Sequence, residues 1–93
     1  MTELSNGYNL QVLPHEGRKA YILFNLALES HIVLSVINAA DKEVRLLINE
    51  PLTAGRQRIL FSYGNLEPEE YRIRLMINND DTIDIENFNF KIS

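Results

Sequence analysis

Few residues in this chain could carry out acid–base or nucleophilic chemistry, and the first candidates are its two histidines, His15 and His31. A catalytic serine needs a histidine close enough to accept its proton. Ser30 directly precedes His31, but neighbouring side chains of a strand point to opposite faces of the sheet. We therefore expect both histidines to lie in loops or at the surface, without a catalytic role.

Acidic residues are concentrated in the segment NNDDTIDIE, residues 78–86, which contains Asp80, Asp81, Asp84 and Glu86. Hard cations such as calcium need several oxygen ligands that converge on one point. The segment has no glycine for the sharp turn of a calcium loop, and its spacing differs from the EF-hand pattern. Asn and Asp also make the local backbone hydrogen bonds of hairpin turns. We predict a solvated hairpin and no cofactor, with a weak divalent-cation site at Asp80, Asp81 and Asp84 as the alternative.

A second acidic group, Glu67, Glu69 and Glu70, surrounds Pro68. Glycoside hydrolysis needs two carboxyl groups on opposite sides of a cleft, one of them with a raised pKa. Three carboxylates crowded beside a proline are more typical of a solvated turn before a strand. No acid–base pair or metal-binding constellation stands out, so we predict that the protein is not an enzyme.

Composition restricts the partners. The 93 residues carry a net charge of −4, and the nine basic residues are scattered, which argues against nucleic acid. The absence of cysteine excludes disulfides and thiolate metal sites. No apolar run approaches the ~18–20 residues that span a bilayer, so we expect no membrane insertion.

The first residues lack the basic leader and the apolar core of a secretory signal peptide. We expect a cytoplasmic protein if Met1 is the native start, and an extracellular one if the chain was cut from a larger secreted protein.

Apolar residues alternate with other residues along most of the chain, which is typical of β-strands. Turn residues separate the runs. The pattern predicts an all-β fold, a single seven-stranded antiparallel sandwich over residues 1–93. The expected strands cover residues 8–13, 20–29, 31–38, 43–49, 57–63, 70–78 and 88–92. Helix is the alternative in residues 13–30 and 32–50, although Gly17 and the following aromatic residues disfavour it in the first segment.

The alternation changes phase near the C-terminus. Ile83 and Ile85 occupy odd positions, whereas Phe88 and Phe90 occupy even ones, so one face of a regular strand cannot hold all four. We predict a β-bulge or a break near residues 86–87.

Four segments resemble the immunoglobulin-like (Ig-like) module of flagellar hook-capping proteins and the related C-terminal sorting domains of type IX secretion cargo. The segments are ILFNL, IVLSVIN, DKEVRLLINEPLTAGRQRILF and NLEPEEYRIRL, and the resemblance covers about residues 21–77. It implies an Ig-like β-sandwich that acts as a scaffold or adaptor, without catalysis. The chain departs from the pattern at Pro14-His15, where the family usually has Asn-Pro, and at Glu69, where it commonly has Gly. Asp41-Lys42 replaces the usual Gly-Arg, but Asp tolerates the left-handed backbone.

Tyr71 begins a predicted strand directly after a turn. The tyrosine of Ig-type corners occupies such a position, and its hydroxyl bonds to nearby backbone. We therefore predict a structural role for Tyr71. The other tyrosines are spread along the chain and there is no Trp, so the sequence offers little for a carbohydrate-binding face.

The outward positions of the predicted strands are unusually apolar for a sheet that faces water. Apolar residues on neighbouring strands form the kind of patch that marks a protein partner, and arginines could surround it. The predicted contact residues are Tyr21, Leu23, Val33, Ile37, Leu60 and Met76, with Arg72 and Arg74 at the rim. The expected function is that of a small adaptor or structural subunit in a larger bacterial assembly, or of a homo-oligomer. The alternatives are a secretion-sorting domain cut from a larger cargo protein and a carbohydrate-binding module.

Overall fold

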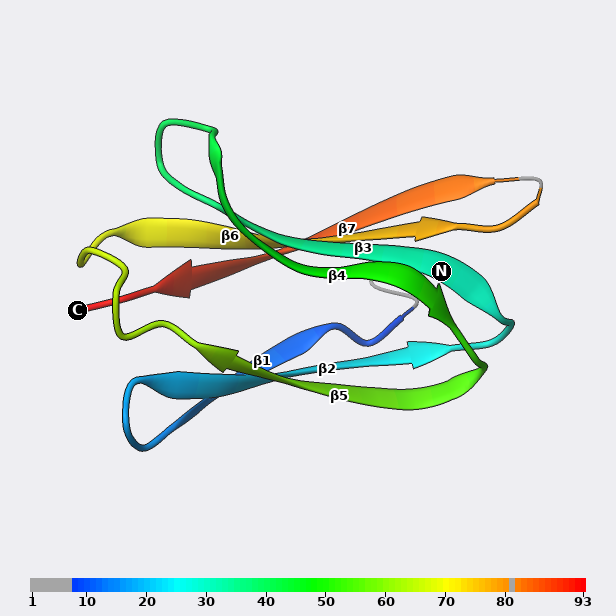
Figure 1. Ribbon diagram of the computed structural model, residues 1–93, viewed down its shortest axis with the longest axis horizontal. Coiled ribbons are helices and arrows are strands. Elements are labelled where there is room, and N and C mark those ends of the chain that lie inside the picture. The colour runs from blue at the N-terminus through cyan, green and yellow to red at the C-terminus, as the bar shows by residue number, and fades with distance from the viewer. Residues whose placement is uncertain (1–7, 81) are drawn as a thin grey trace, which may run out of the picture.

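The computed structural model describes residues 8–80 and 82–93. In these ranges the chain forms seven strands and no helix, which confirms the all-β prediction and excludes the helical alternative (Figure 1). The strands are β1 (Gln11–His15), β2 (Lys19–Leu26), β3 (Ser30–Ile37), β4 (Glu43–Leu52), β5 (Gly55–Ser62), β6 (Glu70–Asn78) and β7 (Ile83–Lys91). Within the same ranges there is no helix that is long and apolar enough to cross a membrane.

The strands form two antiparallel sheets that stack face to face (Figure 1). One sheet has the order β1-β2-β5 and the other has the order β4-β3-β6-β7. The β2–β3, β4–β5 and β6–β7 turns lie at one end of the molecule, and the β1–β2 and β3–β4 turns lie at the other. The architecture is therefore sandwich-like, with two outer faces and two ends.

The alternation of apolar residues produces the core between the sheets. In β2 the side chains of Ala20, Ile22, Phe24 and Leu26 are buried, whereas the residues between them are partly or fully exposed. Strand β6 from the other sheet alternates in the same way. Each fully buried Ile, Leu or Phe side chain contributes roughly 1.5–3 kcal/mol to stability. The core cluster draws on both sheets, so neither sheet is stable without the other.

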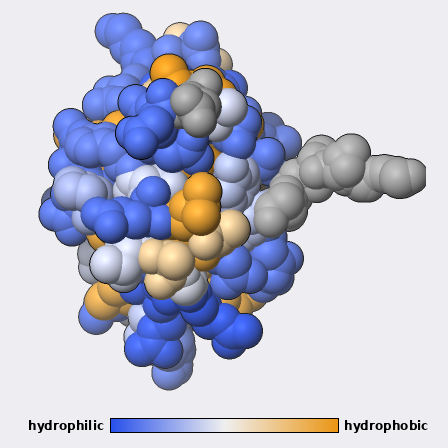
Figure 2. All heavy atoms as spheres, turned by 90° about the vertical axis from the view of Figure 1, so that its right-hand side faces the viewer, coloured by the Kyte–Doolittle hydropathy of each residue, from blue (hydrophilic) through white to orange (hydrophobic). Residues whose placement is uncertain are grey.

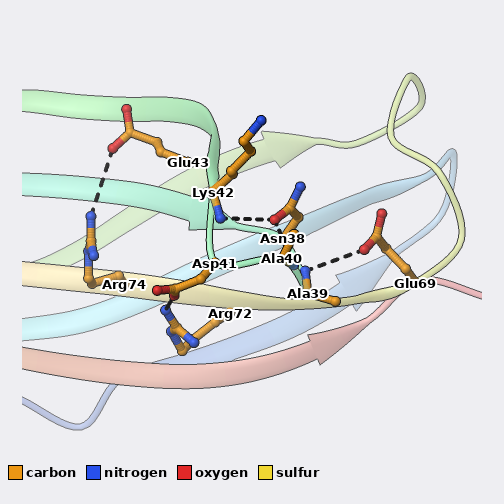
Figure 3. A network of polar contacts seen from close by, with 9 residues as sticks. All are labelled: Asn38, Ala39, Ala40, Asp41, Lys42, Glu43, Glu69, Arg72 and Arg74. Carbon is orange, nitrogen blue, oxygen red and sulfur yellow. Dashed lines mark hydrogen bonds and ion pairs between the residues drawn. The ribbon is translucent and has the colours of Figure 1, made fainter.

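The β3–β4 turn is held by its own polar groups. The Asn38 side-chain oxygen accepts hydrogen bonds of 2.9 Å from the backbone N–H groups of Ala40 and Lys42. Asp41 has a φ of 65°, which confirms the left-handed conformation expected at this position. The turn therefore has a fixed shape, and its acidic side chains extend toward β6 (Figure 3).

The C-terminal strand differs from the prediction. Strand β7 begins at Ile83, and it pairs with β6 residue for residue without a bulge, so the predicted break near residues 86–87 is wrong. The phase change is accommodated differently, since Ile83 and Ile85 are exposed while Phe90 is buried. An unbroken strand keeps every ladder hydrogen bond with β6, at the cost of two exposed isoleucines. The irregular pairing lies instead between β3 and β4, where register shifts leave Val44 and Leu47 unpaired.

Tyr71 has the structural role that the sequence predicts. Its hydroxyl donates a 2.7 Å hydrogen bond to the backbone oxygen of Glu67, four residues earlier. The ring is buried at the start of β6. Burial and the neighbouring carboxylate of Glu69 raise the pKa of Tyr71, because both disfavour the phenolate. This bond fixes the connection from β5 to β6.

Candidate interaction surfaces

The predicted contact residues lie on opposite sides of the molecule. Tyr21, Leu23 and Leu60 belong to β2 and β5, on the outer side of the three-stranded sheet. We call this surface the β2 face, and it also includes Leu13, Lys19, Arg56 and Arg58. The remaining predicted residues lie on the outer side of the four-stranded sheet. We call that surface the β3 face, and it comprises Val33, Ser35, Ile37, Leu46, Arg72, Arg74, Met76, Ile83 and Ile85.

The β2 face has an apolar row across its three strands. Leu13 of β1 pairs with Tyr21 of β2, and Tyr21 pairs with Leu60 of β5. Leu13 is 47% exposed and Leu60 is 50% exposed, while Tyr21 and Leu23 are half-buried. Side chains directly opposite one another on adjacent strands are in contact distance, so the row is continuous. Two leucines therefore flank a tyrosine on an open surface.

The Tyr21 ring is held between two other side chains. The ring centroids of His15 and Tyr21 are 5.3 Å apart, and the Arg58 guanidinium carbon lies 4.7 Å from the Tyr21 centroid. A cation–π contact at an exposed site contributes about 0.5–1 kcal/mol. These contacts place the planar Arg58 group beside the apolar row. They also cover the flat ring that a sugar would need for stacking.

The β2 face is basic although the whole chain is acidic. Strands β1, β2 and β5 contain Lys19, Arg56 and Arg58 but no Asp or Glu. Among the described residues, none of these three cations takes part in an ion pair. A hollow of about 180 Å³ lies beside Arg56 on this face, and it is lined by Asn9, Gln11, Leu23, Phe24, Asn25 and Arg56. The face thus combines apolar side chains with available positive charge.

The β3 face has its apolar row at the end that carries the β6–β7 turn. Val33 pairs with Met76, and Met76 pairs with Ile85. Ile85 is 50% exposed and Ile83 is 61% exposed. These two isoleucines were not among the predicted contact residues, although the phase change in β7 was the signal for them. The exposed Leu13 and Leu46 were not predicted either, because the short patterns around them give no such signal.

At its other end the β3 face is closed by charged side chains (Figure 3). Arg72 forms an ion pair of 2.5 Å with Asp41, and Arg74 lies 3.9 Å from Glu43. Arg72 pairs in the ladder with Ile37, which is only 2% exposed. Ile37 thus offers little surface to a partner, and the two arginines predicted at the rim are engaged within the chain.

An open hollow of about 840 Å³ lies at the end of the molecule shown in Figure 2, where Leu28 is 63% exposed. It is lined by Leu28, Glu29, Ser30, His31, Pro51, Asn78, Asn79 and Asp80. The Ser30 hydroxyl donates to the backbone oxygen of Leu28 at 3.1 Å. The His31 Nε2 atom lies 2.6 Å from the Asn49 side-chain oxygen. Ser30 and His31 therefore have separate partners and do not form a nucleophile–base pair.

The acidic segments are used in structural contacts. Asp84 accepts a 2.5 Å hydrogen bond from the Tyr8 hydroxyl, and this bond is the main cause that raises the pKa of Tyr8 to about 12. Glu69 accepts a 3.3 Å hydrogen bond from the backbone of Ala39. Asp81 lies outside the described residues. In the part of the chain that the structure describes, no group of three or more His, Asp or Glu side chains could hold a metal ion.

The chain matches no protein-family model, and it has no significant match among curated proteins.

Proposed function

We propose that this protein is a non-catalytic module for protein–protein contact, acting as a small adaptor or structural subunit of a larger assembly or of a homo-oligomer. The observation that carries the proposal is the row of Leu13, Tyr21 and Leu60 on the β2 face. Leu13 and Leu60 are half exposed, and Arg58 lies over the ring of Tyr21, which pairs with both leucines. Aromatic and arginine side chains are enriched in protein interfaces, where apolar contacts form the centre.

We further propose that the module is Ig-like. Antiparallel sheets that share a core, with a tyrosine corner at the entry to the sixth strand, support this class. In constant-type Ig domains the fourth strand joins the sheet of the first, second and fifth strands. Here β4 pairs with β3. The proposed module is therefore a variant in which the fourth strand belongs to the sheet of the third, sixth and seventh strands. The resemblance to hook-capping and sorting modules agrees with a scaffold role.

The contact with Arg58 favours protein binding over carbohydrate binding. Sugars stack on an uncovered aromatic ring, whereas Tyr21 is bordered by His15 and Arg58. Exposed leucines on both sides of the ring suit apolar side chains of a partner.

The test is the native size of the untagged protein in lysate from its own cells, measured by gel filtration with antibody detection. The variant Leu13→Glu/Leu60→Glu changes the β2 face, and the matched variant Ile83→Glu/Ile85→Glu changes the β3 face. Both pairs are exposed aliphatic residues, so neither variant should unfold the domain.

We expect the wild-type protein to elute in a particle larger than a monomer, and the β2-face variant to elute as a monomer. The proposal is wrong if the wild-type protein elutes as a monomer, or if neither variant changes its size.

A further inference from the structure

We propose that the β2 face binds an acidic protein segment that carries apolar side chains. This inference rests on the proposed function and names the chemistry of its partner. It comes from the charge of the face, which is opposite in sign to the net charge of −4 on the chain.

The cations of the β2 face are placed around its apolar row. Arg58 lies over Tyr21, and it is two residues before Leu60 in β5, on the same face of the sheet. Arg56 pairs with Asn25 toward the end that carries the β2–β3 turn, and Lys19 pairs with Ser62 at the opposite end. A partner that covers the leucines would therefore meet a positive charge in both directions along the strands. Unlike charges across an interface steer association and select the partner.

The arginines suit carboxylates in particular. A guanidinium group presents a planar set of donors that matches the two oxygens of Asp or Glu. The Arg58 guanidinium carbon lies 4.7 Å from the Tyr21 ring centroid, and this contact favours a position of the group beside the apolar row. The hollow beside Arg56 has a volume of about 180 Å³ and can take one side chain. Sites for whole small molecules are larger, on the order of 300–1,000 Å³.

Nucleic acid fits the face less well than protein does. Binding to a phosphate backbone depends on many Lys and Arg contacts, and only three cations lie on these strands. The exposed Leu13 and Leu60 would remain beside charged phosphates without apolar contacts.

The experiment is a selection from a library of random peptides against the immobilised full chain. Binding of the enriched peptides is then measured with two matched variants. Arg56→Gln/Arg58→Gln removes charge from the β2 face, and Arg72→Gln/Arg74→Gln removes the same charge from the β3 face. Thermal unfolding monitored by circular dichroism shows that each variant is folded before binding is measured.

We expect the enriched peptides to be negatively charged and to contain apolar residues. The Arg56→Gln/Arg58→Gln variant should weaken their binding roughly tenfold or more, because each lost charge contact contributes on the order of 1 kcal/mol. The Arg72→Gln/Arg74→Gln variant should change binding by less than about twofold, because its arginines already pair within the chain.

Several outcomes would overturn the inference. Peptides that bind the β2 face regardless of charge would leave the proposed function intact but refute the acidic partner. Equal losses of peptide binding in both variants, or no enriched peptide, would also refute it.

A separate arm mixes the chain with phosphatidylserine vesicles. Co-sedimentation that requires Arg56 and Arg58, without enrichment of acidic peptides, would assign the face to a lipid surface instead. A monomeric wild-type protein in the lysate experiment would refute the proposed function itself, whatever the peptide selection gives.

Discussion

The two outer faces contain similar residue types but use them differently. On the β3 face, Arg72 pairs with Asp41 of the β3–β4 turn, and Arg74 pairs with Glu43, the first residue of β4. On the β2 face, Arg58 contacts Tyr21, and the three strands supply no carboxylate. The difference arises where β3 connects to β4, because this connection places two carboxylates beside the arginines of one face. Whether an arginine is available to a partner thus depends on residues that are distant in the sequence.

The residues beneath Arg72 and Arg74 on the β3 face also differ from the apolar row of the β2 face. Ile37 and Ser35 lie on the β3 face, yet both are buried, and their ladder partners in β6 are Arg72 and Arg74. Leu13 and Leu60 on the β2 face are half exposed. One end of the β3 face therefore behaves as an additional layer of core, whereas the β2 face is open.

The largest expected effect is on stability, and it distinguishes a buried residue of the β3 face from an exposed residue of the β2 face. Ile37→Ala should destabilise the domain by about 2–3 kcal/mol, because it leaves a cavity under the arginines. Leu60→Ala removes a half-exposed side chain and should cost less than about 1 kcal/mol. Urea unfolding measures both values, and equal losses would show that the faces do not differ in burial.

A second prediction concerns Ser35, whose buried hydroxyl has no hydrogen-bond partner among the described residues. A buried hydroxyl without a partner carries a desolvation cost. Ser35→Ala should therefore raise the free energy of unfolding by about 1 kcal/mol. A decrease in the urea midpoint would mean that the hydroxyl is satisfied in solution.

A third prediction tests what the two ion pairs contribute to stability and to the availability of the arginines. The variant Asp41→Asn/Glu43→Gln keeps the size of both side chains and removes their charges. We expect a loss below about 1 kcal/mol, because the carboxylates are well exposed to solvent. In the peptide selection, this variant should gain binding of acidic peptides at the β3 face. Unchanged binding there would show that pairing is not what distinguishes the faces.

The smallest effect is expected at alkaline pH. The folded-state pKa of Tyr8 is raised from its ordinary value of 10.0 to about 12, so the folded protein holds this proton more tightly than the unfolded chain. The corresponding stability is present below pH 10 and is lost as the pH rises through about 12. Tyr8→Phe should reduce this loss in thermal unfolding curves between these pH values. Identical pH dependence in both proteins would contradict the Tyr8–Asp84 bond.

Much of the fold could be predicted from the sequence. Alternation of period two identifies the strands and the inward residues of β2 and β6, and Tyr71 and Asp41 have the predicted hydrogen bond and backbone conformation. The phase change in β7 has two physical solutions, a bulge or an exposed pair of isoleucines, and alternation alone does not choose between them. The sequence pattern also did not predict that Arg72 is engaged within the chain, because its partner Asp41 lies 31 residues away.

The most direct test of the account is site-specific photo-crosslinking in the native cells. A photoreactive phenylalanine analogue replaces Leu60 on the β2 face or, as the matched position, Ile85 on the β3 face, since both residues are 50% exposed. We predict that position 60 gives a discrete adduct whose cross-linked peptide is an acidic segment, and that Arg56→Gln/Arg58→Gln abolishes it. An adduct at position 85 with none at position 60 would contradict the assignment of binding to the β2 face.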